Sequence, residues 1–351
     1  MARATYDKDA NMIRLSVPYG TSFYQPKSGT YYYLHHLDDV RFWESHPFTV
    51  ASIRALPDPV TDADADSDDG YQSYEEMGES ISLLRGDVSP RTYELDNNHN
   101  STVSNRNSTH DYHTTTAASP TLNFLIRPYD SSTRRLAQAA SATWPQPAQM
   151  RVIVEGPYGH TQPFQAFDSL LFVVGGSGIV VPLSYLETLL VTALEASACP
   201  PEGDEADAGD GARPEDSLRH RVKRRVHIVW AVREAAFASS ILRRDLRDLL
   251  RRHSRHDNVS FSLDVYITGD AESQYLELDK LPKGIDVLQE RPDVSEEVRG
   301  AARELGSQQK LAVVACGPAR MADDSRKAVV DMLGTGREGS SIEYFEESFN
   351  W

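Results

Sequence analysis

Four short motifs in this 351-residue chain carry groups that could hold a nucleotide. The first is the glycine-rich run Gly175-Gly-Ser-Gly178, which follows the apolar segment 170–174. Glycines let a backbone approach a pyrophosphate closely, and the start of a following helix presents free N–H groups to it. The spacing is not G-x-G-x-x-G, so a tight turn without a ligand remains an open alternative at this point.

A second motif, Cys316-Gly-Pro318, ends the apolar segment 311–316 and precedes a predicted helix over 320–333. Ligands bind at the carboxyl ends of parallel strands, so a polarisable thiol at this place could lie against a reacting ring. A buried core cysteine is the simpler interpretation of Cys316 when it is taken alone.

Two further motifs lie earlier in the chain. Gly156-Pro-Tyr-Gly159 ends a strand-like segment and, taken alone, is typical of a turn between domains. His46-Pro-Phe-Thr49 follows an aromatic-rich segment, and its side chains, together with the hydroxyl of Ser52, could hold a ribityl chain or a flavin edge. A lone histidine is more often structural than functional, so His46 decides nothing by itself.

Charge and composition narrow the classes of protein. The chain has 36 basic and 52 acidic residues, and its net charge of −16 disfavours nucleic acid and anionic lipid as partners. The two cysteines, Cys199 and Cys316, cannot form a disulfide scaffold or a CxxC zinc site, which indicates a reducing compartment. The opening residues MARATYDKDA lack the apolar core of a signal peptide. Two H-x-x-H pairs lie in polar settings, so we expect no metal site; they are His110/His113 and His253/His256.

The elements that must position these motifs are of two kinds. Before residue 165, short segments alternate apolar and polar residues, which predicts an antiparallel sheet or barrel; they are 13–17, 30–34, 122–127 and 151–155. After residue 165, apolar strands alternate with helices, which predicts a doubly wound parallel sheet. The predicted strands are 170–174, 226–232, 261–268 and 311–316, and leucines at helical spacing mark 183–194 and 242–249.

Two polar tracts interrupt this pattern, at about 57–119 and about 198–221. Both are too polar to bury much surface, so we expect disordered surface insertions. The uncharged run 170–186 is nearly long enough to span a bilayer, but its glycine-rich turn and Pro182 favour a strand, a turn and a helix. The segment 243–255 carries six arginines on a predicted helix. A solvated face paired with Asp245 and Asp248 is favoured there over docking to an anionic surface.

The order of the four motifs, closed by Glu346-Glu-Ser-Phe-Asn-Trp351, resembles the cytosolic dehydrogenase portion of fungal ferric-chelate reductases. These enzymes group with the NADPH oxidases in the ferredoxin–NADP reductase-like superfamily. Val229-Trp-Ala-Val-Arg233 also matches the strand that follows the pyrophosphate loop in this family. The resemblance covers the chain outside the two polar tracts. It implies an antiparallel β-barrel that binds FAD over 1–165, followed by a doubly wound α/β domain that binds NADPH over 166–351.

The resemblance implies an FAD site on the barrel, with contacts from His46, Pro47, Phe48, Thr49, Ser52, Arg127, Thr133 and Trp351. Arg127 would bind the FAD pyrophosphate, and Thr133 would contribute its hydroxyl from the turn that follows. Ser131-Ser132 stands where the family usually has glycine before that threonine, so the shape of this turn departs from the family. Trp351 would stack on the flavin and swing aside before the nicotinamide can stack there.

The implied NADPH site involves Gly156, Pro157, Tyr158, Gly175, Gly176, Ser177, Gly178, Ile179, Arg233, Cys316, Gly317 and Pro318. Arg233 would bind the adenosine 2′-phosphate, or it would instead bridge Glu234 or a solvent partner. Cys316 would lie near nicotinamide C4 and flavin N5. Cys316 and Trp351 are therefore the candidate catalytic residues.

In this family NADPH gives hydride to FAD, and single electrons then pass to haem and to ferric iron. The haem belongs to a transmembrane portion, so we expect this chain to be a separated dehydrogenase module. It would be soluble and cytoplasmic by itself, and would lie on the cytosolic side of the plasma or vacuolar membrane in the full-length family. The expected partners are NADPH and a one-electron acceptor, with no nucleic acid. Two alternatives are an NADPH oxidase-type core that reduces dioxygen and a non-catalytic nucleotide-binding regulatory module.

Overall fold

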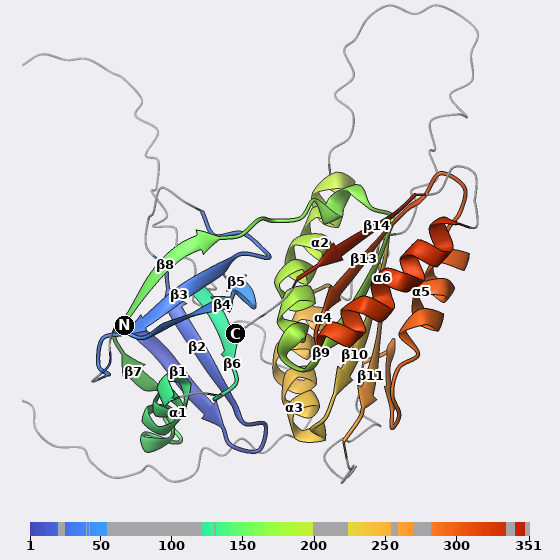
Figure 1. The fold of residues 1–351 in the computed structure, drawn as a ribbon. Helices are drawn as coiled ribbons and strands as arrows, with labels where there is room; N and C mark the ends of the chain where they lie inside the picture. Colours follow the sequence, from blue (N-terminus) through green and yellow to red (C-terminus); the bar gives the residue numbers. More distant parts are fainter. Residues whose placement is uncertain are drawn as a thin grey trace, which may run out of the picture. The chain divides into compact units, whose positions relative to one another are not determined.

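The computed structural model describes ten stretches of the chain (Figure 1). These are residues 1–19, 25–39, 41, 43–54, 121–129, 131–198, 224–253, 259–269, 282–334 and 341–347. Side chains are not described for residues 54, 191–198, 248, 252 and 253. The polar tract predicted at about 57–119, nearly all of the one at about 198–221, and Trp351 lie outside the described residues.

The N-terminal part consists of two antiparallel sheets packed around one core. The five-stranded sheet has the order β5-β6-β2-β1-β7 and the three-stranded sheet has the order β4-β3-β8. The strands are β1 (Ala2–Asp7), β2 (Met12–Pro18), β3 (Tyr31–His36), β4 (Ser45–Thr49), β5 (Ser52–Arg54), β6 (Thr121–Ile126), β7 (Ala148–Met150) and β8 (Val152–Tyr158). The alternation expected from the sequence sets the register, with Leu15 opposite Phe124 and both side chains buried.

A helix that the sequence analysis did not anticipate, α1 (Ser131–Ala142), packs on this part of the molecule. It buries Leu136, Ala137 and Ala140 against β1, β2 and β7. From the sequence, Thr133 was expected in a turn after the strand. It lies instead in the first turn of α1. Its Oγ1 accepts a hydrogen bond from the Tyr129 N–H at 2.9 Å. A helix that begins at the Ser-Ser-Thr run is physically reasonable, because short hydroxyl side chains favour helix starts.

The second part is a six-stranded sheet in the order β12-β11-β10-β9-β13-β14, with every pair parallel. Its strands are β9 (Ser169–Gly175), β10 (Arg224–Val232), β11 (Val259–Ile267), β12 (Ile285–Leu288), β13 (Lys310–Cys316) and β14 (Ser341–Glu346). One face packs on α2 (Val180–Ala198), α3 (Ala235–Ser240) and α4 (Arg247–His253). The other packs on α5 (Val294–Arg303) and α6 (Ala319–Leu333), as Figure 1 shows. Helices on both faces of a parallel sheet confirm the predicted doubly wound domain.

The uncharged run 170–186 forms most of β9, a short 3-10 turn and the start of α2, as the sequence indicated. All but the last residue of β9 are buried, which explains its continuous apolar character in the centre of a parallel sheet. In the described ranges, no helix combines the length and the apolar character needed to cross a membrane.

The predicted helix around residues 242–249 is interrupted by a π-helix over Ile241–Leu246, between α3 and α4. Arg14 of β2 reaches this turn and donates from Nη2 to Ser240 O, Ser240 Oγ and Asp245 Oδ2, at 3.2, 3.0 and 2.8 Å. Ser240 Oγ in turn donates to Asp7 Oδ2 at 2.6 Å. Asp245 therefore pairs with an arginine of the N-terminal part, whereas the sequence analysis paired it with arginines of its own helix. Asp248 has no described side chain.

Candidate nucleotide-binding site

The glycine-rich run and the Cys-Gly-Pro motif meet at the carboxyl ends of the neighbouring strands β9 and β13. Between these two strands the order of the sheet reverses, which is where open α/β sheets bind ligands. A Cβ atom on Gly175 would lie 2.6 Å from Pro318 Cδ, and one on Gly178 would lie 2.3 Å from Cys316 O. Only glycine permits this close approach, so the two motifs form one cradle of backbone.

The cradle is held in place from the next strand. The indole Nε1–H of Trp230, on β10, donates to Gly176 O at 2.9 Å. Gly176 has a φ of 53° and begins the 3-10 turn Gly176–Ile179, which runs directly into α2. The turn therefore leads into the start of a long helix, as a pyrophosphate-binding turn requires.

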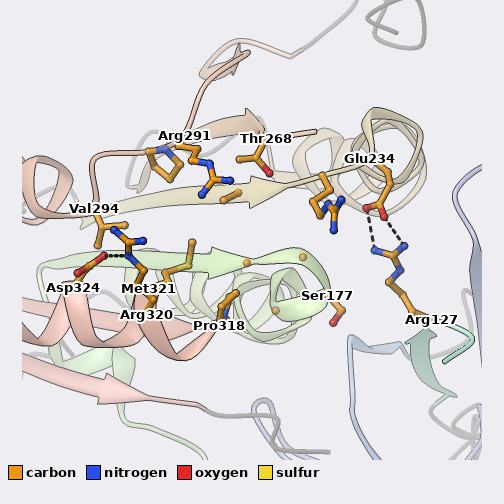
Figure 2. A pocket seen from close by; sticks show the side chains of 17 residues that line it. Arg127, Ser177, Glu234, Thr268, Arg291, Val294, Pro318, Arg320, Met321 and Asp324 are labelled. Carbon is orange, nitrogen blue, oxygen red and sulfur yellow. Dashed lines mark hydrogen bonds and ion pairs between the residues drawn. The ribbon is translucent and has the colours of Figure 1, made fainter. Parts of the chain in front are cut away.

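A pocket of about 730 Å³ opens over this cradle (Figure 2). This volume falls within the usual range for small-molecule and cofactor sites. It is lined by Arg127, Gly175, Gly176, Ser177, Gly178, Ala231, Arg233, Glu234, Thr268, Arg291, Pro292, Val294, Gly317, Pro318, Arg320, Met321 and Asp324. Of the residues expected for NADPH, seven line it: Gly175, Gly176, Ser177, Gly178, Arg233, Gly317 and Pro318. Ile179 and Cys316 are buried next to the cradle.

Four arginines line the pocket, and two of them already have carboxylate partners. Figure 2 shows Arg127 and Glu234 pointing toward each other at one end, and Arg320 next to Asp324 at the other. Within the part of the chain that the structure describes, neither Arg233 nor Arg291 forms an ion pair. Neither Arg291 nor Arg320 was expected from the sequence to bind a ligand. No pattern in the sequence marks Arg291, which follows β12, as a ligand-binding residue; it is the fold that brings it into the pocket.

The ion pair of Arg127 and Glu234 joins the residue that follows β6 to the residue that precedes α3. Nη1 of Arg127 lies 3.2 Å from Oε2 of Glu234, and Nη2 lies 3.2 Å from Oε1. The guanidinium also lies over the ring of Phe237, 4.9 Å from its centroid. Hydrogen bonding from Arg127 lowers the pKa of Glu234, partly opposed by burial. Glu234 therefore bonds to Arg127 and not to Arg233, the partner considered from sequence.

Cys316 is fully buried at the end of β13. Burial raises the pKa of its thiol, and the charge of Glu347 raises it further. The N–H of Glu347 donates to Ala315 O at 2.9 Å, which continues the β14 pairing beyond Glu346. Burial also raises the pKa of Glu347, against a lowering contribution from a hydrogen bond with Gln162. A neutral thiol and a carboxyl that holds its proton more strongly than usual therefore lie close together, and the sequence analysis assigned no role to Glu347.

Four of the eight residues expected for FAD lie on β4, which forms an edge of the three-stranded sheet. His46, Phe48 and Thr49 are half-buried, and Pro47 is buried opposite Tyr33. An edge strand leaves backbone N–H and C=O groups unpaired on one side, which fits a ligand with many polar groups along its length. Ser52 Oγ accepts a hydrogen bond from Asn123 Nδ2 at 3.2 Å.

Gly156-Pro-Tyr-Gly159 lies at the end of β8, outside the set of residues that lines the 730 Å³ pocket. A Cβ on Gly156 would lie 2.8 Å from Cδ1 of the buried Tyr32, and Gly156 has a φ of 146°. Tyr158 stacks on Tyr31 with ring centroids 5.8 Å apart. These contacts give the motif a structural role, and its predicted place beside the nicotinamide stays a prediction.

One cluster of metal-ligand types occurs elsewhere in the described residues. His227, Asp264 and Glu297 each bring one ligand atom within 4.8 Å of the others. Hydrogen bonds already engage this cluster, since His227 Nε2 lies 3.0 Å from Asp264 Oδ2 and Tyr266 donates to Glu297 Oε1 at 2.6 Å. Of the histidine pairs considered from sequence, only the backbone of His253 lies within the described residues.

Comparison with known proteins identifies the two parts of the chain. Residues 167–330 match the profile of the ferric reductase NAD binding domain, and residues 2–61 match that of an FAD-binding domain. The chain therefore carries a ferric reductase NAD binding domain and an FAD-binding domain. With these two domains it is an oxidoreductase module that binds FAD and a nicotinamide dinucleotide. The glycine cradle, which a Cβ atom would fill, fits the pyrophosphate of that dinucleotide.

Its relatives include ferric/cupric reductase transmembrane component 2 of Saccharomyces cerevisiae, which is 23% identical over 97% of this chain and 38% of that protein. Ferric reductase transmembrane component 6 of the same yeast is 26% identical over 65% of this chain and 29% of that protein. The chain thus spans about a third of the length of these relatives. Among solved structures, a ferredoxin NADP+ reductase from Neisseria gonorrhoeae with bound FAD and NADP is 14% identical, with a TM-score of 0.48 over 98% of this chain and 97% of that chain.

Proposed function

We propose that this chain is the NADPH dehydrogenase module of a ferric-chelate reductase. When bound, NADPH and FAD supply hydride transfer and an output of single electrons, directed in the full-length family to haem and then to ferric iron. The observation that carries the proposal is the 730 Å³ pocket, in which a backbone cradle faces the same cavity as two arginines that form no ion pair with any described residue.

On the dinucleotide side, the chain's residues bind and orient. The N–H groups of Gly176–Gly178 and the start of α2 hold the pyrophosphate. Arg233 binds the adenosine 2′-phosphate, and Arg291, which lines the same pocket, adds positive charge. Gly317 and Pro318 form the floor beneath the nicotinamide, with the Cys316 thiol kept neutral behind them.

On the flavin side, the edge strand β4 presents His46, Phe48 and Thr49 to FAD, with Ser52 nearby. Thr133 also remains a predicted contact, although its hydroxyl is bonded to the Tyr129 N–H. Trp351 lies outside the described residues and stays the flavin-stacking residue that the resemblance predicts. On that prediction, Trp351→Ala relaxes discrimination against NADH. An unchanged preference for NADPH over NADH in steady-state kinetics would count against that role.

The electron acceptor is proposed to be a haem-bearing transmembrane portion on the cytosolic side of a membrane. Two supports are the relatives named as transmembrane components and the chain's partial coverage of their length. An NADPH oxidase-type core, which reduces dioxygen, is the second candidate. Its only support is that the NADPH oxidases and the ferric-chelate reductases belong to one superfamily. The E-E-S-F-x-W ending favours the reductase.

The test is anaerobic stopped-flow absorbance of the chain reconstituted with FAD and mixed with NADPH. Bleaching of the oxidised-flavin band, reversed by ferricyanide or a ferric chelate, would support the proposal. Bound FAD that NADPH does not bleach would indicate a non-catalytic nucleotide-binding module, and rapid reoxidation by dioxygen alone would favour the oxidase.

The matched variant for this test is Arg233→Ala. It should weaken NADPH binding by about 1.5–3 kcal/mol, the usual contribution of a hydrogen bond to a charged group, and should leave NADH binding unchanged. An equal loss with both dinucleotides would show that Arg233 supports the fold or the ribose and not the 2′-phosphate.

A further inference from the structure

Two residues of opposite charge directly follow β10, and both line the pocket. They are Arg233 and Glu234. A carboxylate near this place bonds to the adenosine ribose 2′-hydroxyl of NADH, whereas an arginine accommodates the 2′-phosphate of NADPH. The two side chains therefore favour different dinucleotides, and the preference of the pocket depends on which of them is available.

The carboxylate of Glu234 is already engaged. Both of its oxygens face the two terminal nitrogens of Arg127, each at 3.2 Å, in a two-point arrangement (Figure 2). The ring of Phe237 lies 4.9 Å from the same guanidinium and packs against it. The side chains of Arg127 and Glu234 are 28% and 49% exposed, so solvent weakens the pair without removing its geometry.

The neighbouring cations are not neutralised in this way. Among the described residues, Arg233 and Arg291 form no ion pair, although both line the pocket. An unpaired Glu234 would add a negative charge next to the place where the 2′-phosphate binds, and like charges at close range oppose binding. Pairing with Arg127 removes that charge and occupies the oxygens that the ribose 2′-hydroxyl of NADH would need.

We propose that Arg127 determines the dinucleotide specificity of this pocket by occupying and neutralising Glu234, which leaves Arg233 to select the 2′-phosphate. The residue directly follows β6, outside the α/β domain, and acts on the ligand through Glu234. It is thus a positioning residue and not a catalytic one. The inference rests on the proposed function, since it takes the ligand of the pocket to be NADPH.

The test measures NADP+ and NAD+ binding by calorimetry, together with flavin content, for the FAD-reconstituted chain and three variants. Arg127→Met should lower the ratio of NADP+ to NAD+ affinity about ten-fold, because Glu234 is then unpaired. The double variant Arg127→Met/Glu234→Gln should restore the ratio to near the wild-type value, because both charges are gone. Arg127→Lys keeps the charge without the two-point geometry and should fall between wild type and Arg127→Met.

An unchanged ratio in Arg127→Met, or a lowered ratio that the double variant does not restore, would overturn the inference. Loss of flavin with an unchanged ratio would assign Arg127 to the FAD pyrophosphate instead. Glu234→Gln tests the same point if Arg127→Met fails to fold. NAD+ affinity should not fall in that variant, and a ten-fold fall would show that the carboxylate is open to the ribose. If the wild-type chain does not prefer NADP+ over NAD+, the proposed function fails in its choice of dinucleotide, whatever the variants do.

Discussion

Replacing Gly178 by alanine tests whether the two motifs at the ends of β9 and β13 are packed as closely as described. The added Cβ would lie 2.3 Å from Cys316 O and 3.1 Å from both the carbonyl carbon and Sγ of Cys316. The first distance is about 1 Å inside ordinary van der Waals contact. The atom it meets belongs to the backbone of a central strand, which cannot rotate away as a side chain would.

The expected cost follows from that geometry. Either β13 shifts away from β9, which disturbs the pairing of Cys316 with Val174, or the turn moves outward. Overpacking of this kind costs about 1–3 kcal/mol, and a backbone clash belongs at the upper end, about 2–3 kcal/mol. For a domain of this size that corresponds to a fall in Tm of about 4–12 °C. The same displacement opens the cradle, so NADP+ affinity should fall at least about ten-fold.

The assay is urea and thermal unfolding followed by circular dichroism, combined with NADP+ titration. Gly300→Ala is the matched control, because a Cβ at Gly300 in α5 would have no heavy atom within 4 Å. That control should be more stable than wild type by about 0.5–1 kcal/mol, from helix propensity alone. If Gly178→Ala unfolds at the wild-type midpoint and binds NADP+ normally, the close approach of the two motifs is wrong.

Three further predictions concern other parts of the chain. In a Cys199→Ser variant, Cys316 of the folded chain should react with a thiol reagent at pH 8 at least about a hundred-fold more slowly than Cys316 of the chain unfolded in urea. Burial keeps the reagent away from the thiol and raises the pKa of the thiol. Equal rates would contradict this prediction. The raised pKa of Glu347 means that its contribution to stability is lost as pH rises from its ordinary value of 4.5 through the folded-state value. Glu347→Gln should therefore unfold at the wild-type urea concentration at pH 4 and at a higher one at pH 8, and the opposite trend would refute the assigned burial. Arg14→Met should lower the free energy of unfolding by about 2 kcal/mol, because the Arg14 side chain is 16% exposed and bonds to Ser240 and Asp245. As a control, replacing the exposed Arg41 by methionine should lower it by less than about 0.5 kcal/mol. Equal losses would show that the Arg14 contacts do not stabilise the fold.

The strands that carry the fold were predictable from their pattern, because one face or both faces of each strand are buried. Alternation located β2 and β6, and continuous apolar runs located β9 and β13. His46-Pro-Phe-Thr49 follows the aromatic-rich strand β3, as expected, but that it forms a strand of its own, β4, was not predicted. Pro47 is tolerated there because β4 is an edge strand, so its missing N–H group need not break the hydrogen bonds between two central strands. Edge position depends on the whole sheet and has no local signal.

The helices that were missed differ in how visible they were. The start of α5 is marked by Asp293, whose side chain accepts from the Glu296 N–H at 3.0 Å, an N-cap that sequence alone could have revealed. The π-helix over 241–246 has no comparable signal. The glycine cradle was visible as a motif, but the partner of Arg127 was not, because Glu234 lies 107 positions away. Ion pairs between distant elements require the tertiary fold.

The wide turn over Ile241–Leu246 has a consequence for how insertions and deletions are tolerated. Residues 240 and 245 are five positions apart, and in a regular α-helix of 3.6 residues per turn they would point about 140° away from each other. Here the i→i+5 spacing of a π-helix lets a single guanidinium, that of Arg14, bond to both. Loss of one codon within 241–244 would leave the serine and the aspartate four positions apart in a regular helix, about 40° from each other on the same face. The guanidinium of Arg14 could then still bond to both, so the wide turn takes up one extra residue without breaking the link between the two parts of the chain.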